Sequence, residues 1–178
     1  MTRSWRTHRR AVCLLVDTSG SMSGRAVAIA AVAAAAVVLA ADGRLDPAIL
    51  AFGAQRTELQ PQGSRRVPEE LVGELVQLRG HGMTDRAGAL RAAAVQLARA
   101  TADERLTVLV SDCLRTAGGA PASALAGIDR LHVLCPLPTP YSGLAAPELA
   151  RSGGGISQPV RRLSEVAPAL TRVLARLR

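Results

Sequence analysis

Three oxygen-bearing side chains follow the first apolar stretch of the sequence at alternate positions. Asp17, Ser19 and Ser21 come directly after Ala11–Val16, with Gly20 between the two serines. In an extended or curled loop, this spacing turns alternate side chains toward one point. One carboxylate and two hydroxyls are hard oxygen donors, which suit Mg²⁺, Mn²⁺ or Ca²⁺ better than zinc. The same residue types also occur in plain turns, where they bond to neighbouring backbone, so this segment alone leaves both interpretations open.

Two further residues, Thr84 and Asp112, carry oxygen atoms that the same site needs. Thr84 lies at the end of a glycine-rich segment, just before a stretch with helical periodicity, and Asp112 follows the buried run Leu106–Val110. Taken singly, Thr84 is also typical of a helix cap, and Asp112 of a turn at a strand end. Their joint appearance in this order favours one metal site. Its predicted ligands are Asp17, Ser19, Ser21, Thr84 and Asp112.

The elements that must position these residues alternate between strand and helix along the sequence. The short continuous apolar run Ala11–Val16 indicates a strand buried on both faces, and Leu106–Val110 another buried strand. Further strands are expected at Pro47–Phe52, Leu131–Leu134 and Ile156–Val160, with a shorter one at Gln55–Leu59. Helices are predicted at Arg25–Ala41, from Pro68 to a stop at Gly80, after Asp85, and at Pro121–Ile128. A further short helix is expected to end at Glu148–Arg151. The last predicted helix has one apolar face, formed by Leu163, Val166, Leu170, Val173, Leu174 and Leu177.

Repeated strand–helix crossovers predict an α/β fold, in which a mainly parallel sheet lies between two layers of helices. Such sheets bind ligands at the carboxyl ends of their strands. Asp17 and Asp112 both follow predicted strands. We therefore expect them, together with the loop that carries Thr84, to lie at one edge of the sheet.

The length and the charge of the sequence fit one domain with basic ends. A chain of 178 residues can bury a sizeable core as a single domain. We place this domain at residues 11–178, after a basic N-terminal tail at 1–10. The net charge of +8 comes from this tail, with four Arg, and from residues 151–178, with six Arg and one Glu. The middle of the chain is nearly neutral and aromatic residues are 2% of the total, so the basic excess argues only weakly for a nucleic-acid partner.

The cysteines and the longest uncharged run bear on the compartment. Cys13, Cys113 and Cys135 lie in or beside apolar runs without C-x-x-C spacing, which indicates buried, reduced thiols. The run Ala26–Ala41 is shorter than the roughly 20 residues that a membrane span requires. No signal-peptide pattern follows the basic N-terminus. We therefore expect a cytoplasmic protein that does not enter a membrane.

The three oxygen-bearing segments together resemble a von Willebrand factor type A (VWA) domain over about residues 10 to 178. Asp17-x-Ser19-x-Ser21 matches the first segment of that family's metal-ion-dependent adhesion site (MIDAS), Thr84 the second and Asp112 the third. The resemblance implies a three-layer, Rossmann-like fold whose six-stranded sheet contains one short antiparallel strand, here Gln55–Leu59. It also implies an octahedral Mg²⁺ that these residues bind directly or through water. A carboxylate of a partner protein would complete the coordination of that ion.

Within this family, the sequence is similar to bacterial intracellular members related to the D component of magnesium chelatase and to the partners of MoxR-type AAA+ ATPases. That similarity implies an adaptor that couples an ATPase to its client. Two positions depart from the family pattern. Met83 separates Gly82 from Thr84, and Cys113 stands where a glycine often follows the third-segment Asp. We expect Asp85 to cap a helix and not to bind the metal.

Catalytic interpretations find little support in the sequence. It contains no Walker lysine, no Gly-x-Gly-x-x-Gly after the first strand and no Gly-x-Ser-x-Gly around Ser19 or Ser21. An aspartyl phosphatase would need a second carboxylate at position 19. His81 is the one candidate base, and we expect it to be a solvated loop residue. We therefore expect that the protein is not an enzyme; a nucleic-acid-associated module that uses the Arg-rich ends and a metal-dependent hydrolase stay as alternatives.

Overall fold

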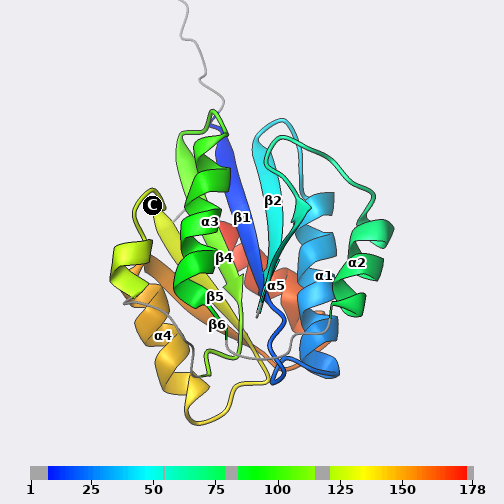
Figure 1. Cartoon of the computed structure of the whole chain (residues 1–178), viewed down its shortest axis with the longest axis vertical. Coiled ribbons are helices and arrows are strands. Elements are labelled where there is room, and N and C mark those ends of the chain that lie inside the picture. The colour runs from blue at the N-terminus through cyan, green and yellow to red at the C-terminus, as the bar shows by residue number, and fades with distance from the viewer. Residues whose placement is uncertain (1–7, 54, 79–83, 115–120, 176–178) are drawn as a thin grey trace, which may run out of the picture.

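One six-stranded sheet forms the centre of the molecule (Figure 1). A computed structural model describes residues 8–53, 55–78, 84–114 and 121–175. The strands lie in the order β3-β2-β1-β4-β5-β6 and comprise β1 (Arg10–Asp17), β2 (Leu45–Phe52), β3 (Arg56–Gln60), β4 (Glu104–Val110), β5 (Arg130–Pro136) and β6 (Gly154–Val160). Neighbouring strands run parallel, except that β3 is antiparallel to β2. The predicted α/β class and the short antiparallel strand are confirmed.

Helices cover both faces of this sheet and complete the three layers. They are α1 (Arg25–Leu39), α2 (Pro68–Gln77), α3 (Arg86–Ala98), α4 (Ser142–Ser152) and α5 (Val166–Leu174). One apolar cluster joins the sheet to α1, α2 and α5, and contains Ile29, Leu71 and Val166. A second cluster on the other face joins it to α3 and α4, and contains Leu90 and Leu149. Figure 1 shows α3 in front of the sheet and α5 behind it.

The central strand β1 divides its side chains between these two clusters. Val12, Leu14 and Val16 belong to the α1 side, whereas Cys13 and Leu15 belong to the α3 side. All of them are 0–1% exposed. This burial on both faces explains why the segment reads as a continuous apolar run and not as an alternating one.

The uncharged run that follows the first loop forms α1. Seven residues of α1 are buried, and five of them are alanines, which allow the helix to lie close to the sheet. The helix begins after Gly24, whose φ of 55° is readily adopted only by glycine. Among the described residues, the structure contains no helix of the length and apolarity needed to cross a membrane.

Three predicted helices differ from the observed ones. Pro121–Ile128 contains only a 3₁₀ turn, at Pro121–Ala124. The helix expected to close at Glu148–Arg151 begins at Ser142 and contains Pro147. The last helix opens as a 3₁₀ turn at Leu163–Glu165; Leu163 is 47% exposed and therefore lies off the buried face. Leu177 and the predicted stop at Gly80 lie outside the described residues.

His132 on β5 is a polar side chain enclosed by the core. It is 1% exposed. Its Nδ1 accepts a hydrogen bond from the Ile156 backbone N–H at 3.2 Å, and its Nε2 has no hydrogen-bond partner among the described residues. Burial, and secondly the charge of Arg130, lower the pKa of His132 to about 4 from its ordinary value of 6.5. The imidazole is therefore neutral in the folded protein at neutral pH.

This burial predicts that the protein loses stability in mild acid. Between about pH 6.5 and pH 4, an unfolded histidine takes up a proton that folded His132 does not, so the free energy of unfolding falls by up to ~3 kcal/mol. The variant His132→Asn keeps an acceptor for the Ile156 N–H but does not titrate. Urea denaturation at about pH 7 and pH 4.5 should show a smaller loss for this variant than for the wild type. Equal losses would contradict the prediction.

Candidate metal site

Asp17 ends the central strand and is held by two hydrogen bonds. Its carboxylate is 3% exposed. Oδ1 accepts the backbone N–H of Ser19 at 2.8 Å, and Oδ2 accepts the Ser111 hydroxyl at 2.6 Å. The two bonds fix both oxygen atoms while leaving further lone pairs free for a cation.

The loop after β1 brings the hydroxyls of Ser19 and Ser21 close together and directs the side chain of Thr18 away from them. The Ser19 and Ser21 hydroxyl oxygens are 3.2 Å apart. The Ser19 carbonyl accepts the Met22 N–H at 2.9 Å, which closes a turn. Thr18 instead donates both its backbone N–H (2.8 Å) and its hydroxyl (3.1 Å) to the Phe52 carbonyl of β2. Alternate residues of this loop therefore point in two directions: the two serine hydroxyls lie together, whereas Thr18 points toward β2.

Asp112 lies two residues beyond the end of β4. It is 8% exposed, and its Oδ1 accepts the Leu114 N–H at 3.0 Å. Burial raises the pKa of Asp17, although the hydrogen bonds from Ser111 and Ser19 act against this, and the nearby charge of Asp112 raises it further. The structure thus brings the two carboxylates within electrostatic reach of each other.

Cys113 occupies the position at which the family pattern often has glycine, and its backbone has a conformation that glycine adopts readily. Its φ is 55°, in the left-handed region that non-glycine residues rarely adopt. The Ser111 hydroxyl accepts the Cys113 N–H at 3.0 Å, which holds this conformation. Cys113 is buried, and burial raises the pKa of its thiol to about 12. All three cysteines are free and buried, as predicted.

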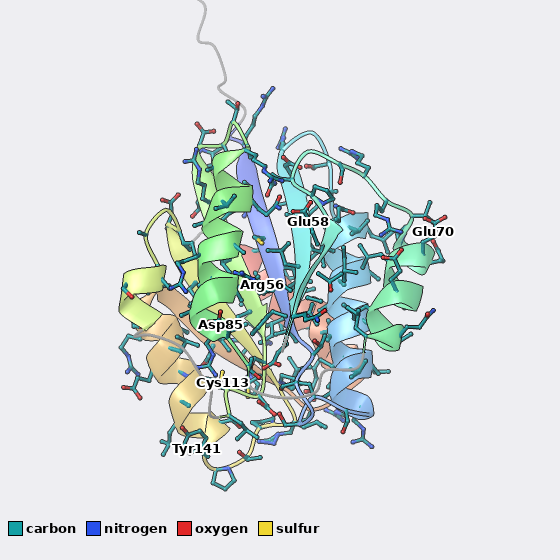
Figure 2. The ribbon with its side chains drawn as sticks, in the orientation of Figure 1. Arg56, Glu58, Glu70, Asp85, Cys113 and Tyr141 are labelled. Atoms are coloured by element: carbon teal, nitrogen blue, oxygen red, sulfur yellow. The ribbon has the colours of Figure 1, made fainter. Side chains whose placement is uncertain are left out.

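Thr84 directly precedes the N-terminus of α3. It is 5% exposed, and its hydroxyl makes no hydrogen bond to another described residue. The Asp85 carboxylate accepts the Gly88 N–H at 2.8 Å, so its predicted role as a helix cap is confirmed. Figure 2 shows Asp85 and Cys113, the neighbours of Thr84 and Asp112, near the same edge of the sheet. Gly82, Met83 and His81 lie outside the described residues.

The donor set fits a hard dication. The buried Asp17 carboxylate is costly without a cation, and the charge of Asp112 adds to that cost. The other three predicted ligands are hydroxyls, which suit Mg²⁺ and not a soft metal. No group of three or more His, Cys, Asp or Glu side chains that could hold a metal occurs in the described part of the chain. A metal site here therefore depends on the hydroxyls, and their role as ligands stays a prediction.

Ser111 is a residue of the candidate site that sequence analysis did not single out. Its hydroxyl joins the Asp17 carboxylate to the Cys113 N–H, and its own backbone N–H donates to the Leu134 carbonyl of β5 at 3.2 Å. The available signal was a polar residue at 0% exposure, directly after an apolar strand. Buried hydroxyls require partners, but the sequence alone does not name the partner.

Comparison with known proteins identifies the family of this chain. A model for VWA domain containing CoxE-like proteins matches residues 1–174. The chain belongs to this family. No curated protein matches the sequence of this VWA domain.

Solved structures share its fold at low sequence identity. An aerotolerance-related membrane protein of Bacteroides fragilis is 16% identical, with a TM-score of 0.68, covering 92% of this chain and 98% of the other. A von Willebrand factor type A protein of Catenulispora acidiphila is 15% identical, with a TM-score of 0.71, covering 90% and 41%. Proximal thread matrix protein 1 of the mussel byssus, with a zinc-occupied MIDAS motif, is 11% identical, with a TM-score of 0.68, covering 94% and 47%. The VWA domain therefore spans less than half of the last two proteins.

Because the Ser111 hydroxyl connects the Asp17 carboxylate to the Cys113 N–H, we predict that removing this hydroxyl lowers both the stability of the protein and its affinity for Mg²⁺. Ser111→Ala removes a hydrogen bond to a carboxylate and leaves the Cys113 N–H without a partner, so we expect a loss of about 2–3 kcal/mol in the free energy of unfolding. We also expect about a 10–100-fold weaker affinity for Mg²⁺, as for other residues that support metal ligands. Urea denaturation and calorimetric Mg²⁺ titration measure the two effects.

A matched control is Ser152→Ala, which removes the local hydrogen bond from the Ser152 hydroxyl to the Leu149 carbonyl in α4. It should change stability by less than about 0.5 kcal/mol and leave Mg²⁺ affinity unaltered. Equal effects of the two substitutions would show that Ser111 has no special role at the site.

Proposed function

We propose that this VWA domain is a Mg²⁺-dependent protein-binding module. The observation that carries the proposal is the Asp17 carboxylate, buried at the end of β1 and fixed by the Ser19 N–H and the Ser111 hydroxyl, with Asp112 close by. Asp17, Ser19, Ser21, Thr84 and Asp112 would hold the ion. Mn²⁺ and Ca²⁺ are alternatives with the same preference for oxygen.

The role of the ion follows from its coordination number. Mg²⁺ requires near-octahedral oxygen coordination and keeps waters where the protein supplies no ligand. An Asp or Glu of a partner protein can replace one such water and so bind the domain through the metal. Asp17 and Asp112 offset the charge of a dication, so the incoming carboxylate is attracted chiefly by direct coordination.

Binding is favoured over catalysis because the described residues near Asp17 include no evident base. His132 is enclosed in the core, with its pKa lowered to about 4. His8 lies 3.7 Å from Asp103, near the amino end of β1, whereas Asp17 lies at the carboxyl end. His81, the one candidate base in the sequence, lies outside the described residues, and we expect it to be a solvated loop residue. We therefore propose a binding protein and not an enzyme, and keep the cytoplasmic location expected from the sequence as part of the proposal.

The partner that we propose is an AAA+ ATPase of the MoxR type, or a related chelatase-like complex. The family match to CoxE-like proteins agrees with the sequence resemblance to members associated with such ATPases. In this role the domain couples the ATPase to a client through the metal-bound carboxylate.

Metal binding is tested by substituting the central carboxylate. In calorimetry, Asp17→Ala should weaken Mg²⁺ binding by about 100-fold or more, since a charged ligand is lost from a site that otherwise offers one carboxylate and neutral hydroxyls. Mg²⁺ at about 100 times its Kd should stabilise the wild type by ~2.7 kcal/mol and the variant hardly at all. Asp103→Ala, at the opposite edge of the sheet, is the matched control and should bind Mg²⁺ normally. Normal binding by a folded Asp17→Ala protein would refute the proposed site.

Partner binding is tested with a MoxR-type ATPase from the same organism. In a biosensor assay, its complex with the full chain should form in Mg²⁺, dissociate in EDTA and fail with Asp17→Ala. A complex that forms equally in EDTA would rule out the metal-gated mechanism. Binding to duplex DNA that persists in EDTA and weakens steeply with salt would instead favour the nucleic-acid alternative.

A further inference from the structure

A cavity opens at the carboxyl ends of β5 and β6. Its volume is about 450 Å³, a size that accommodates one or two large side chains. Its walls come from the β5–α4 loop, the first turns of α4 and the end of β6. The lining includes Cys135, Ser142, Gly143, Ala146, Ser157 and Arg161. Several prolines complete a mainly apolar lining.

This cavity belongs to the same edge of the molecule as the candidate metal site. The β4 and β5 ends are joined by the Ser111 N–H bond to the Leu134 carbonyl. Cys135, on the cavity wall, lies close enough to Asp112 for that charge to contribute to its raised pKa, which burial chiefly causes. The two non-glycine residues with positive φ, among those described, are Cys113 and Leu137, and they follow the ends of these neighbouring strands.

Three exposed apolar side chains belong to the same β5–α4 segment that forms part of the cavity wall. Leu137, Tyr141 and Leu144 are 37%, 54% and 78% exposed. Tyr141 is the single tyrosine of the chain and lies at the start of α4, near the strand ends (Figure 2). Apolar surface gathered at one edge is typical of an interaction site.

One unpaired cation lies in the wall of this apolar cavity. The backbone N–H of Arg161 donates to Glu165 Oε2 at 2.7 Å, which fixes the position of the residue. Its guanidinium has no hydrogen bond or ion pair with another described residue, and the residue is exposed. The Ser142 hydroxyl, by contrast, is engaged with Thr139, whose N–H it accepts at 2.7 Å. Arg161 therefore leaves a free positive charge beside an apolar hollow.

We propose that this cavity receives a large apolar side chain of the protein partner, with a carboxylate of the same segment paired to Arg161. The inference rests on the proposed function, since the segment is the one that also offers an Asp or Glu to the metal. The free charge of Arg161 matches an acidic segment, and the adjacent apolar walls match an aliphatic or aromatic residue near that acid. The partner is thus an acidic segment with an embedded apolar residue, and it contacts the metal and the cavity together.

The cavity is tested first without metal, with N-acetyl-L-leucine as the probe, because this molecule joins an aliphatic side chain to a carboxylate. In EDTA, ¹H–¹⁵N NMR of the full chain should show saturable shifts at Gly143, Ala146 and Ser157, with a Kd on the order of millimolar. N-acetyl-L-leucinamide, which lacks the charge, and acetate, which lacks the side chain, should each bind several-fold more weakly. Shifts elsewhere, or equal binding of the amide, would overturn the proposal.

Two pairs of variants localise the binding. Arg161→Glu should weaken the probe about tenfold or more, whereas Arg151→Glu, an equal charge change at the other end of α4, should not. Gly143→Leu should obstruct the cavity, because Gly143 is part of its lining and a Cβ there meets no atom within 4 Å, so that the larger side chain is added without a clash. Gly73→Leu in α2 is equally free of clashes and should leave binding unchanged. Undiminished binding by Arg161→Glu and Gly143→Leu would exclude this cavity.

The link to the metal is tested with fluorescent peptides of the form Asp-spacer-Leu-Asp, with glycine–serine spacers of increasing length. At the spacer length that spans both sites, Mg²⁺ should tighten binding, and Asp17→Ala should remove only this increment. Arg161→Glu should weaken the peptide both with and without Mg²⁺. Failure of the proposed metal function removes the increment but leaves probe binding in EDTA intact, so the two failures are distinguishable. Dimerisation of the chain that Arg161→Glu abolishes would assign the cavity to a second copy and overturn the proposal.

Discussion

The burial of the Asp17 carboxylate is the constraint on which the other features of the site depend. A charged group that is 3% exposed is tolerated only if hydrogen bonds and a counter-charge replace the water it has lost. The Ser19 N–H and the Ser111 hydroxyl supply the hydrogen bonds. No basic side chain is paired with this carboxylate among the described residues, and the nearby Asp112 increases the electrostatic cost. This local imbalance is what a bound dication would relieve.

The register of the parallel strands places the other residues of the candidate site beside Asp17. Asp17 is aligned with Phe52 of β2, and its predecessor Val16 is aligned with Val110 of β4. The strands therefore end at the same level, which places Ser111 and Asp112 beside the end of β1. A shift of one residue in this register would exchange the two buried faces of β1, so that its side chains met the wrong helix layers and Asp17 lay on the other side of the sheet. The apolar cores on the two faces of the sheet thus protect the geometry of the site.

The parts of this arrangement that follow local rules could be predicted from the sequence. The central strands β1, β4 and β5 are largely apolar runs, and Pro68 occupies the first turn of α2, as its fixed φ favours. Asp85 caps α3 through a bond to a residue only three positions away. The parallel order also predicted that Asp17 and Asp112 share one edge. Each of these inferences needed only near neighbours in the sequence or the general geometry of α/β folds.

The parts that sequence analysis missed depend on contacts between distant segments or on competing local bonds. Ser111 acts on a carboxylate 94 positions earlier, and no spacing rule identifies such a pair. Reciprocal hydrogen bonds between Thr139 and Ser142 stabilise the start of α4. The helix continues through Pro147, although a proline usually indicates a helix break, so the sequence did not predict where this helix begins. Leu163 follows the helical period of α5, but the 3₁₀ turn rotates it away from the sheet.

A metal that binds a carboxylate distinguishes poorly between partners, because every Asp or Glu offers it the same group. Selectivity must come from what surrounds the ion. On this chain, the surroundings include one edge that carries the single tyrosine, two exposed leucines and the unpaired Arg161. Aromatic anchors are otherwise scarce, with one Trp and one Phe, and Phe52 is 1% exposed. The apolar contribution to selectivity therefore has to come largely from the partner's own side chain, and a concave acceptor beside an unpaired positive charge is the surface that such a side chain requires.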